Sequence, residues 1–274
     1  SQLKSNRALS DQDLINNNST FSSIYAQIDY KNDLKIELLR KGGKKVFVND
    51  FLLKKQSDVK NYIRSVCFSS SDINIVKGDP SFRRNWLDKV VTQIEPVYTE
   101  LLSRFNKLLK QRGHFWRSEI SKDFHSTNLI DSFDSQMAIV GARIYRRRRR
   151  AINKIKPFVE YWHQYLSKSK ENIHINYLSA GIDIKVQDDE KVITDYLLDS
   201  LLKQRETEKF TAKCSIGPHR DDVEFLINNI SIRKFGSSGQ QRTMVLALKM
   251  AELDFLKNII AVEPILILDD VLAE

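Results

Sequence analysis

The sequence has little cysteine, proline or glycine and no long hydrophobic run, and each shortage excludes a class of protein. Its two cysteines, Cys67 and Cys214, lie far apart and form no CxxC pair. Neither a disulfide framework nor a zinc knuckle is indicated, so we expect two reduced, mostly buried thiols. Nine glycines and five prolines in 274 residues exclude collagen-like and low-complexity chains. With no apolar stretch near the roughly 18 residues of a membrane span and no signal-peptide pattern, we expect a soluble, cytoplasmic protein with no membrane partner.

Positive charge is the most informative feature of the composition. Lysine and arginine number 44 against 35 aspartates and glutamates, which gives a formal net charge of +9. Such an excess favours polyanionic partners, because neutralising phosphates releases their condensed counterions. Since 41% of the residues are hydrophobic, the chain can also bury a core of one large domain or two.

Both ends of the chain have the character of a fragment. The first residue is Ser1 rather than Met, and the last residues, Asp269 to Glu274, directly follow an apolar strand pattern. A strand that runs into charged residues normally leads to a loop and another element. We therefore expect the sequence to be part of a longer chain.

The first two thirds of the chain change from strand patterns to helix patterns. Residues 24–53 alternate apolar and polar positions between turn-forming residues, which predicts short antiparallel strands, and residues 65–68 predict another. Residues 81–168 carry apolar side chains at helical spacing and predict two long helices. Pro157 is expected to kink or restart the second of them.

Strand patterns return in the last third. Residues 173–177 and 182–186 predict strands, and a helix is expected from about 188 to 205. Asn228-Asn229 predicts a two-residue hairpin turn, because both residues tolerate positive φ. The continuous apolar run at 264–268 predicts a strand buried on both faces.

These blocks predict three segments. Residues 1–80 would form the β-rich first part of a sheet domain, and residues 81–208 a helical arm inserted into it. Residues 209–274 would return to the sheet domain and complete it. We find no internal repeat.

Two motifs in the last segment are candidates for chemistry. Ser237-x-x-Gln240 is typical of a capping box that opens a helix, and Gly239 permits close backbone approach. A helix start exposes free N–H groups and the positive end of the helix dipole, which suits an anion. Residues 265–268, followed by Asp269 and Asp270, have the form of a Walker B strand that holds carboxylates at its end. Taken singly, an ordinary capped helix and an ordinary strand end are the alternatives.

With these motifs in place, the chain resembles the RecF family of ABC/SMC-like ATPases over nearly its whole length. The motifs that carry the resemblance occur in the family's order: Lys77-Gly78-Asp79-Pro80 with Arg83-Arg84, Gly217-Pro218-His219-Arg220-Asp221-Asp222, Ser238-Gly239-Gln240-Gln241-Arg242 and Leu268-Asp269-Asp270-Val271-Leu272. The resemblance implies an α/β fold, an ABC-type ATPase head of mixed sheet and helices with an inserted helical arm. It also implies ATP and Mg²⁺ as cofactors.

The resemblance further implies roles for single residues. The signature segment at the helix start would contact nucleotide held by the partner protomer: Ser237, Ser238, Gly239, Gln240, Gln241 and Arg242. Asp269 would orient the metal, and Asp270 would be the catalytic residue that polarises water. Asp72 is a candidate for a Q-loop-like contact.

The function that the resemblance implies is that of a recombination mediator in DNA repair, DNA replication restart and the SOS response to DNA damage. Such a protein binds ATP, dimerises around it, and holds DNA at single-strand/double-strand junctions. It helps load recombinase together with other recombination mediator proteins.

The sequence departs from the family in one respect. None of the nine glycines fits GxxxxGK[ST], so residues 1–274 contain no P-loop, and we expect them alone not to hydrolyse ATP. The intact protein is expected to be a weak ATPase. The alternatives are a non-enzymatic basic helical module that binds DNA or protein, or another SMC-like ATPase head. A P-loop in the sequence upstream of Ser1 would distinguish the ATPase from the module.

The densest basic run lies on the second predicted helix. Five of its cations fall on neighbouring helical positions and are candidates for DNA contact: Arg143, Arg146, Arg147, Arg150 and Lys154. Arg148, by contrast, falls on the apolar stripe. A solvated helix face is the alternative for the run.

Three further charged or polar positions have open roles. Arg83 and Arg84 suit phosphates or intramolecular acidic partners equally well. His219 lacks metal-ligand spacing to the other histidines, so His219, Arg220 and Asp221 predict a polar network.

Overall fold

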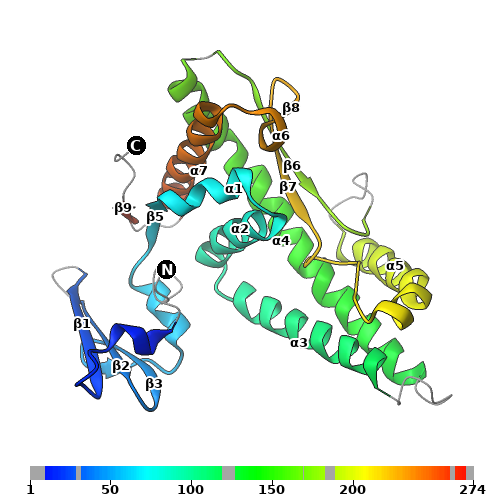
Figure 1. The fold of residues 1–274 in the computed structure, drawn as a ribbon, viewed down its shortest axis with the longest axis horizontal. Coiled ribbons are helices and arrows are strands. Elements are labelled where there is room, and N and C mark those ends of the chain that lie inside the picture. The colour runs from blue at the N-terminus through cyan, green and yellow to red at the C-terminus, as the bar shows by residue number, and fades with distance from the viewer. Residues whose placement is uncertain are drawn as a thin grey trace. The chain divides into compact units, whose positions relative to one another are not determined.

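A computed structural model describes residues 10–28, 32–118, 127–168, 170–182, 189–259 and 263–269. It consists of two compact units (Figure 1). Unit 1 comprises Ser1–Phe68 and Leu256–Asp269, and unit 2 comprises Ser69–Phe255 and Asp270–Glu274. The boundaries of these two units differ from those of the three segments expected from the sequence. The three-segment division stays a prediction.

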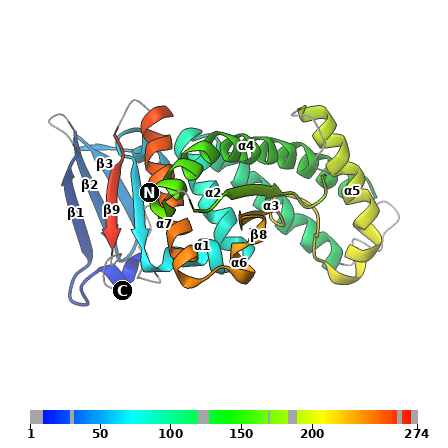
Figure 2. The ribbon, with the colours of Figure 1, turned by 90° about the horizontal axis from the view of Figure 1, so that it is seen from above.

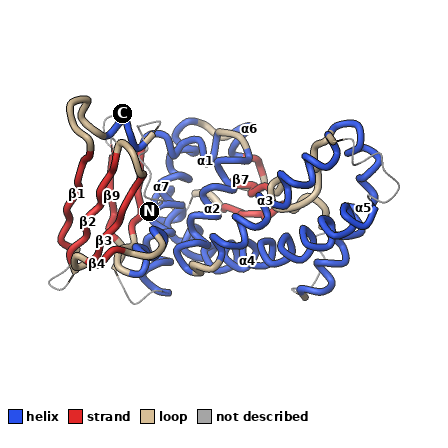
Figure 3. The backbone as a smooth tube through the Cα atoms, turned by 90° about the horizontal axis from the view of Figure 1, so that it is seen from below, coloured by secondary structure: helices blue, strands red, loops and turns tan. Residues whose placement is uncertain are grey.

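Unit 1 contains an antiparallel sheet in which sequential strands are neighbours (Figure 3). The strands are β1 (Phe21–Gln27), β2 (Asp33–Leu39), β3 (Gly43–Val48) and β4 (Phe51–Leu52). Alternate residues of β2 and β3 point to one side, where Leu34, Val46 and Val48 form a small core. The strands predicted within 24–53 are confirmed.

Two short 3₁₀ helices and a strand pair complete unit 1. The helices are η1 (Asp11–Leu14) and η2 (Gln56–Asn61), and β5 (Ser65–Ser69) pairs with β9 (Ile265–Asp269). The prediction that the run at 264–268 is buried on both faces is wrong. Ile265, Ile267 and Leu268 are 46%, 47% and 57% exposed, because β5 is the one strand that pairs with β9 in the described part of the chain.

Unit 2 is built on long helices that lie side by side (Figures 1 and 2). After η3 (Ser70–Ile73) and α1 (Asn74–Lys77) come α2 (Pro80–Ile94), α3 (Tyr98–Arg117), α4 (Thr127–Ser167) and α5 (Glu190–Thr211). Of the two long helices predicted within 81–168, the second is present as α4, whereas the first is divided into α2 and α3, because Pro96 lies directly after the end of α2. The expected restart at Pro157 does not occur: α4 continues through it, with Ile155 and Val159 fully buried on either side.

A small antiparallel sheet of β6 (Ile173–Leu178), β7 (Asp222–Ile227) and β8 (Ile230–Ser231) packs against these helices. Asn228 and Asn229 have φ values of 48° and 65°, so the predicted hairpin turn is confirmed. The sheet leads through α6 (Ile232–Phe235) to α7 (Ser238–Ile259). The strand predicted over 182–186 lies almost entirely outside the described residues.

Both cysteines remain thiols, with Cys214 buried and Cys67 half-buried, as expected. Over the described ranges, no helix is both long and apolar enough to cross a membrane.

Candidate nucleotide-binding site

The start of α7 is a reciprocal capping box. The Gln240 side-chain Oε1 accepts a hydrogen bond from the Ser237 N–H at 2.9 Å, and the Ser237 hydroxyl accepts one from the Gln240 N–H at 3.2 Å. Such caps stabilise a helix by about 1 kcal/mol. Between these two residues, the N–H groups of Ser238 and Gly239 have no acceptor among the described residues. The helix therefore presents two free donors at the positive end of its dipole, a suitable place for an anion.

Two glycines flank this cap for different reasons. A Cβ on Gly236 would lie 2.6 Å from the Ile232 carbonyl oxygen, so the fold itself requires glycine there. A Cβ on Gly239 would meet nothing closer than the Ser237 hydroxyl at 3.9 Å. Packing within the described chain therefore does not require Gly239, and its small size leaves the helix start open to a ligand.

The six predicted signature residues differ in whether their side chains are exposed or are bonded within the fold. Ser237, Ser238 and Gly239 are exposed. Gln240 also donates from its amide nitrogen to Glu171 at 2.8 Å. Gln241 is 7% exposed, and its amide donates to the Ile232 carbonyl oxygen at 3.3 Å. The Gln241 side chain therefore holds α7 against α6 and is turned away from the exposed helix start. Arg242, the next residue, is exposed.

The predicted acidic residues lie in different surroundings. Asp72 closes a cap on η3, where its Oδ2 accepts from the Ser69 N–H at 2.8 Å, and its Oδ1 pairs with Lys249 at 3.0 Å. These contacts give Asp72 a structural role, and the Q-loop-like contact stays a prediction. Asp269 is the last residue of β9, and Asp270 lies outside the described residues.

A buried polar hub around Arg148 connects α4 with three other parts of unit 2. Its guanidinium makes a bidentate pair with Asp88 of α2 at 2.8 and 3.0 Å, and donates to the Pro218 carbonyl oxygen at 2.6 Å. It also lies 3.4 Å from the Asp221 carboxylate. Arg148 and Asp221 are each 2% exposed, so this charge network is screened little by water.

Two tyrosines complete the hub. Tyr98 donates from its hydroxyl to Asp88 at 2.5 Å, and Tyr177 donates to Asp221. Burial raises the pKa of both phenols and of the Asp221 carboxyl, although Arg148 opposes each shift. The sequence marked Arg148 as a cation on an apolar stripe, and that was the signal that could have located the hub.

The neighbouring arginines also have intramolecular partners. Arg83 makes a bidentate pair with Asp222 at 2.6 and 3.0 Å, and Arg84 donates to the Asp221 carbonyl oxygen at 2.8 Å. The sequence left phosphates and intramolecular partners equally open for these two arginines, and in this structure both make intramolecular contacts. Both arginines fasten α2 to the start of β7.

The basic run of α4 is partly used by the fold. Arg143 and Arg146 both pair with Glu190 of α5 at 2.8 Å, and Arg147 pairs with Glu95 at 2.8 Å. The hydrogen bond from Arg143 holds the pKa of Glu190 below its usual value. Arg150 and Lys154 are exposed and are the members of the predicted DNA-contact set best placed for solvent.

Comparison with known proteins gives RecF proteins among its close relatives. The DNA replication and repair protein RecF of Synechococcus sp. (strain CC9605) is 39% identical over 272 residues, which cover 99% of this chain and 74% of that protein. The RecF of Parasynechococcus marenigrum (strain WH8102) is 39% identical over 273 residues, with the same coverage of both chains. The chain belongs to the RecF family. It spans about three quarters of the length of these RecF proteins, and no protein-family model matches it.

Solved RecF structures agree with the sequence relatives. The chain matches a structure of the recombination mediator protein RecF-ATPrS in the RecFOR pathway with a TM-score of 0.89 and 29% identity, over 98% of this chain and 72% of that one. A RecF-ATP structure gives the same TM-score and coverage at 28% identity. The predicted fold class, an α/β ABC-type ATPase head with an inserted helical arm, is confirmed.

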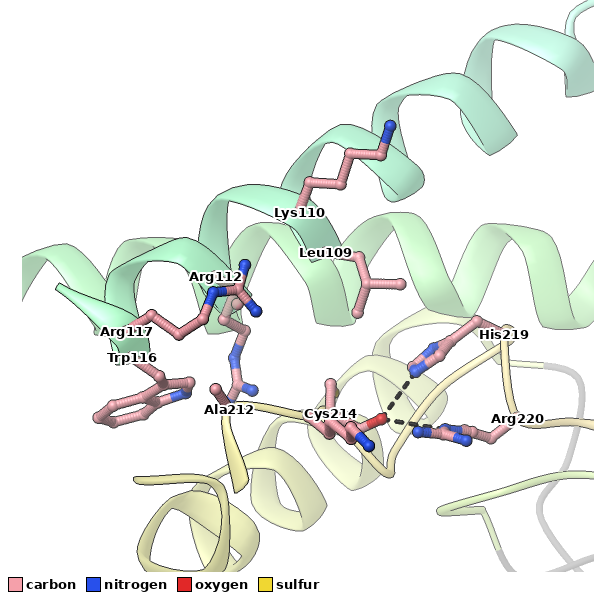
Figure 4. Close-up of a pocket in the computed structure, with 11 residues that line it drawn as sticks. Leu109, Lys110, Arg112, Trp116, Arg117, Ala212, Cys214, His219 and Arg220 are labelled. Carbon is pink, nitrogen blue, oxygen red and sulfur yellow. Dashed lines mark hydrogen bonds between the residues drawn. The ribbon is translucent and has the colours of Figure 1, made fainter. Parts of the chain in front are cut away.

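His219 and Arg220 form part of the polar network expected from the sequence, but Asp221 does not join them. His219 Nε2 lies 2.9 Å from the Cys214 carbonyl oxygen, and Arg220 donates to the same oxygen at 3.0 Å (Figure 4). Asp221 instead accepts from Tyr177 and the Ala180 N–H. The Gly217–Asp222 segment therefore connects two separate clusters.

Burial makes His219 a source of acid sensitivity in this protein. Burial lowers the pKa of His219 from 6.5 to about 4. Between these values the unfolded chain binds a proton that the folded chain does not, so the free energy of unfolding decreases as the pH falls. We expect a loss of about 2 kcal/mol between pH 7 and pH 5 from this residue.

Urea unfolding at the two pH values measures this effect, with His219→Gln as the comparison. The variant should lose less stability on acidification than the parent. Equal losses in both proteins would show that His219 does not set this pH dependence.

Proposed function

We propose that this protein is an ATP-dependent, DNA-binding recombination mediator of the RecF type that acts in DNA repair. The observation that carries the proposal is the match at TM-score 0.89, over 98% of the chain, to the recombination mediator protein RecF-ATP. The net charge of +9 agrees with a polyanionic partner.

The start of α7 would contact the nucleotide that is bound to the partner protomer. The exposed hydroxyl of Ser238 and the free N–H groups of Ser238 and Gly239 suit the γ-phosphate of ATP, and the open space at Gly239 admits it. Ser237 and Gln240 hold this helix start in place through the capping box. ATP bound there would supply the negative charge that joins two protomers into a homodimer.

The end of β9 would supply a ligand for Mg²⁺. An aspartate that ends an apolar strand offers the hard oxygen ligands that Mg²⁺ prefers, and Asp269 has this place. Asp270 would polarise water for a slow hydrolysis. Arg242 would contact the partner's nucleotide together with the other signature residues. Asp72 would make the Q-loop-like contact.

DNA would be held at single-strand/double-strand junctions, and the protein would assist recombinase loading together with other recombination mediator proteins in the cytoplasm. The same activity would serve replication restart and the SOS response. Arg150 and Lys154, exposed on α4, are the contacts we assign to DNA phosphates.

We expect the double variant Arg150→Ala/Lys154→Ala to bind DNA of any base sequence more weakly, because each of the two side chains would neutralise a phosphate. The slope of log K against log salt should become shallower by about 0.9 for each duplex phosphate that the protein no longer neutralises. The measurement is a salt titration of duplex DNA binding in a chain of RecF length.

Lys203→Ala, which removes an exposed cation that pairs with Asp199, is the matched control and should leave the slope unchanged. If the double variant retains both the slope and the affinity of the parent, these residues are only a solvated face of α4.

A further inference from the structure

The capping box of α7 has a third partner from a distant part of the chain. Gln240, whose side chain closes the box, donates from its Nε2 to Glu171 Oε1 at 2.8 Å, across 69 residues of sequence. Glu171 lies between the end of α4 and the first residue of β6, outside any helix or strand. The helix start at Ser237 is therefore completed by a carboxylate that the signature segment does not itself contain.

The position of Glu171 is fixed from two sides. Its neighbour Asn172 donates from its N–H to Asn228 Oδ1 at 3.0 Å and accepts from the Asn228 N–H at 2.7 Å, which ties this segment to the turn between β7 and β8. The second carboxylate oxygen of Glu171, Oε2, lies 3.5 Å from Nε2 of His163, a fully buried ring on α4. One oxygen is thus directed at α4, and Oε1 is left for Gln240.

The two partners of the Gln240 amide determine which way it faces. A carboxylate only accepts hydrogen bonds, and a backbone N–H only donates them. With Glu171 on one side and the Ser237 N–H on the other, the amide nitrogen must face Glu171 and the amide oxygen must face Ser237. The reversed amide would place two acceptors together at one end and two donors together at the other. Glu171 therefore selects the orientation that closes the cap.

We propose that Glu171 is a positioning residue for the signature segment, because it holds the Gln240 amide as the helix start requires. With the cap closed, the Ser237 N–H is bonded, while the N–H groups of Ser238 and Gly239 have no acceptor among the described residues and remain open to a phosphate. A side chain that is already ordered costs less entropy when a ligand arrives. The contact with the partner's nucleotide, the last step of the inference, rests on the proposed function.

Hydrogen exchange of the Ser237 amide, followed by NMR in a chain of RecF length, tests the positioning without nucleotide. In Glu171→Ala the Gln240 amide has no preferred orientation, so the Ser237 N–H should exchange about 3- to 10-fold faster than in the parent. Glu224→Ala is the matched control, because it removes a carboxylate that accepts from the Asn176 amide at 3.3 Å in the neighbouring sheet. It should leave the exchange unchanged. Equal exchange in the parent and in Glu171→Ala would overturn the proposal.

The sign of one substitution in two backgrounds separates hydrogen bonding from general charge. Glu171→Gln should weaken ATP-dependent dimerisation of the parent by about 3-fold, because the introduced amide can face Gln240 either way. In a Gln240→Glu protein, where two carboxylates oppose each other, the same Glu171→Gln should strengthen dimerisation by about 3-fold or more, because it places a donor opposite an acceptor.

Sedimentation with ATP measures both effects. A change of the same sign in the two backgrounds would show that Glu171 acts only through its charge, and would overturn the proposal. The exchange measurement decides the positioning even where the parent fails to dimerise on ATP, a result that would count against the proposed function alone.

Discussion

Replacement of Arg148 by methionine should destabilise unit 2 by about 3–5 kcal/mol, the usual cost of removing one partner from a buried charge pair. Methionine fills much of the same space, so the expected loss comes from charge and hydrogen bonding rather than from a cavity. Asp221, which is 2% exposed, would remain buried with its cation removed, and the Pro218 carbonyl oxygen would lose its 2.6 Å donor.

The effect is large because the hub joins distant segments. Asp88 lies 60 residues before Arg148 and Asp221 lies 73 after it, so the single guanidinium holds α2 and the loop before β7 onto α4. Chemical denaturation followed by circular dichroism measures the loss. Lys154→Met on the same helix removes an exposed cation and should change the stability by less than about 0.5 kcal/mol.

A second substitution checks that the loss belongs to the hub. In Asp221→Asn the anion is removed, so adding Arg148→Met to it should cost less than Arg148→Met costs in the parent. Additive losses, or a loss below about 1 kcal/mol for Arg148→Met alone, would contradict the energetic role of the hub.

Local features of this fold could be predicted from the sequence because their causes are local. The hairpin at Asn228 and Asn229 follows from residues that tolerate positive φ. The cap at Ser237 and Gln240 follows from a spacing of three residues. Both were found where the sequence placed them.

Features that depend on distant partners were harder to predict. Glu190 lies 47 residues from Arg143 and 44 from Arg146, and no pattern in the sequence indicates that they pair. The expected burial of β9 was wrong for a similar reason, since an apolar run does not reveal how many strands will pair with it. Arg148 falls between these cases, because its position on the apolar stripe was visible but its four partners were not.

The other large effect is expected at Ser238. Ser238→Arg should abolish ATP-dependent dimerisation in a chain of RecF length, together with the hydrolysis that depends on it. In the proposed arrangement the helix start faces the γ-phosphate held by the partner protomer. A bulky arginine side chain would fill the space that Gly239 leaves open, and its favourable charge would not offset the steric exclusion.

The structure predicts that this substitution leaves the protomer intact. Ser238 is exposed, and its hydroxyl makes no hydrogen bond to the described residues. The cap depends on Ser237 instead. Nucleotide binding by each protomer should therefore survive, because the substituted residue serves the partner's nucleotide and not its own.

Ser103→Arg is the matched control for size and charge. Ser103 lies exposed on α3, away from the signature segment in sequence, and its substitution should affect neither nucleotide binding nor dimerisation. A fluorescent ATP analogue titrated into each variant establishes that the protomers still bind nucleotide.

Sedimentation of the parent, Ser103→Arg and Ser238→Arg proteins of RecF length, each with and without ATP, tests the central claim most directly. The account predicts that the parent and the Ser103→Arg protein become dimers on addition of ATP, while the Ser238→Arg protein binds the nucleotide and remains a monomer. A Ser238→Arg protein that dimerises on ATP as the parent does would contradict it, and Ser237-x-x-Gln240 would then be a helix cap alone.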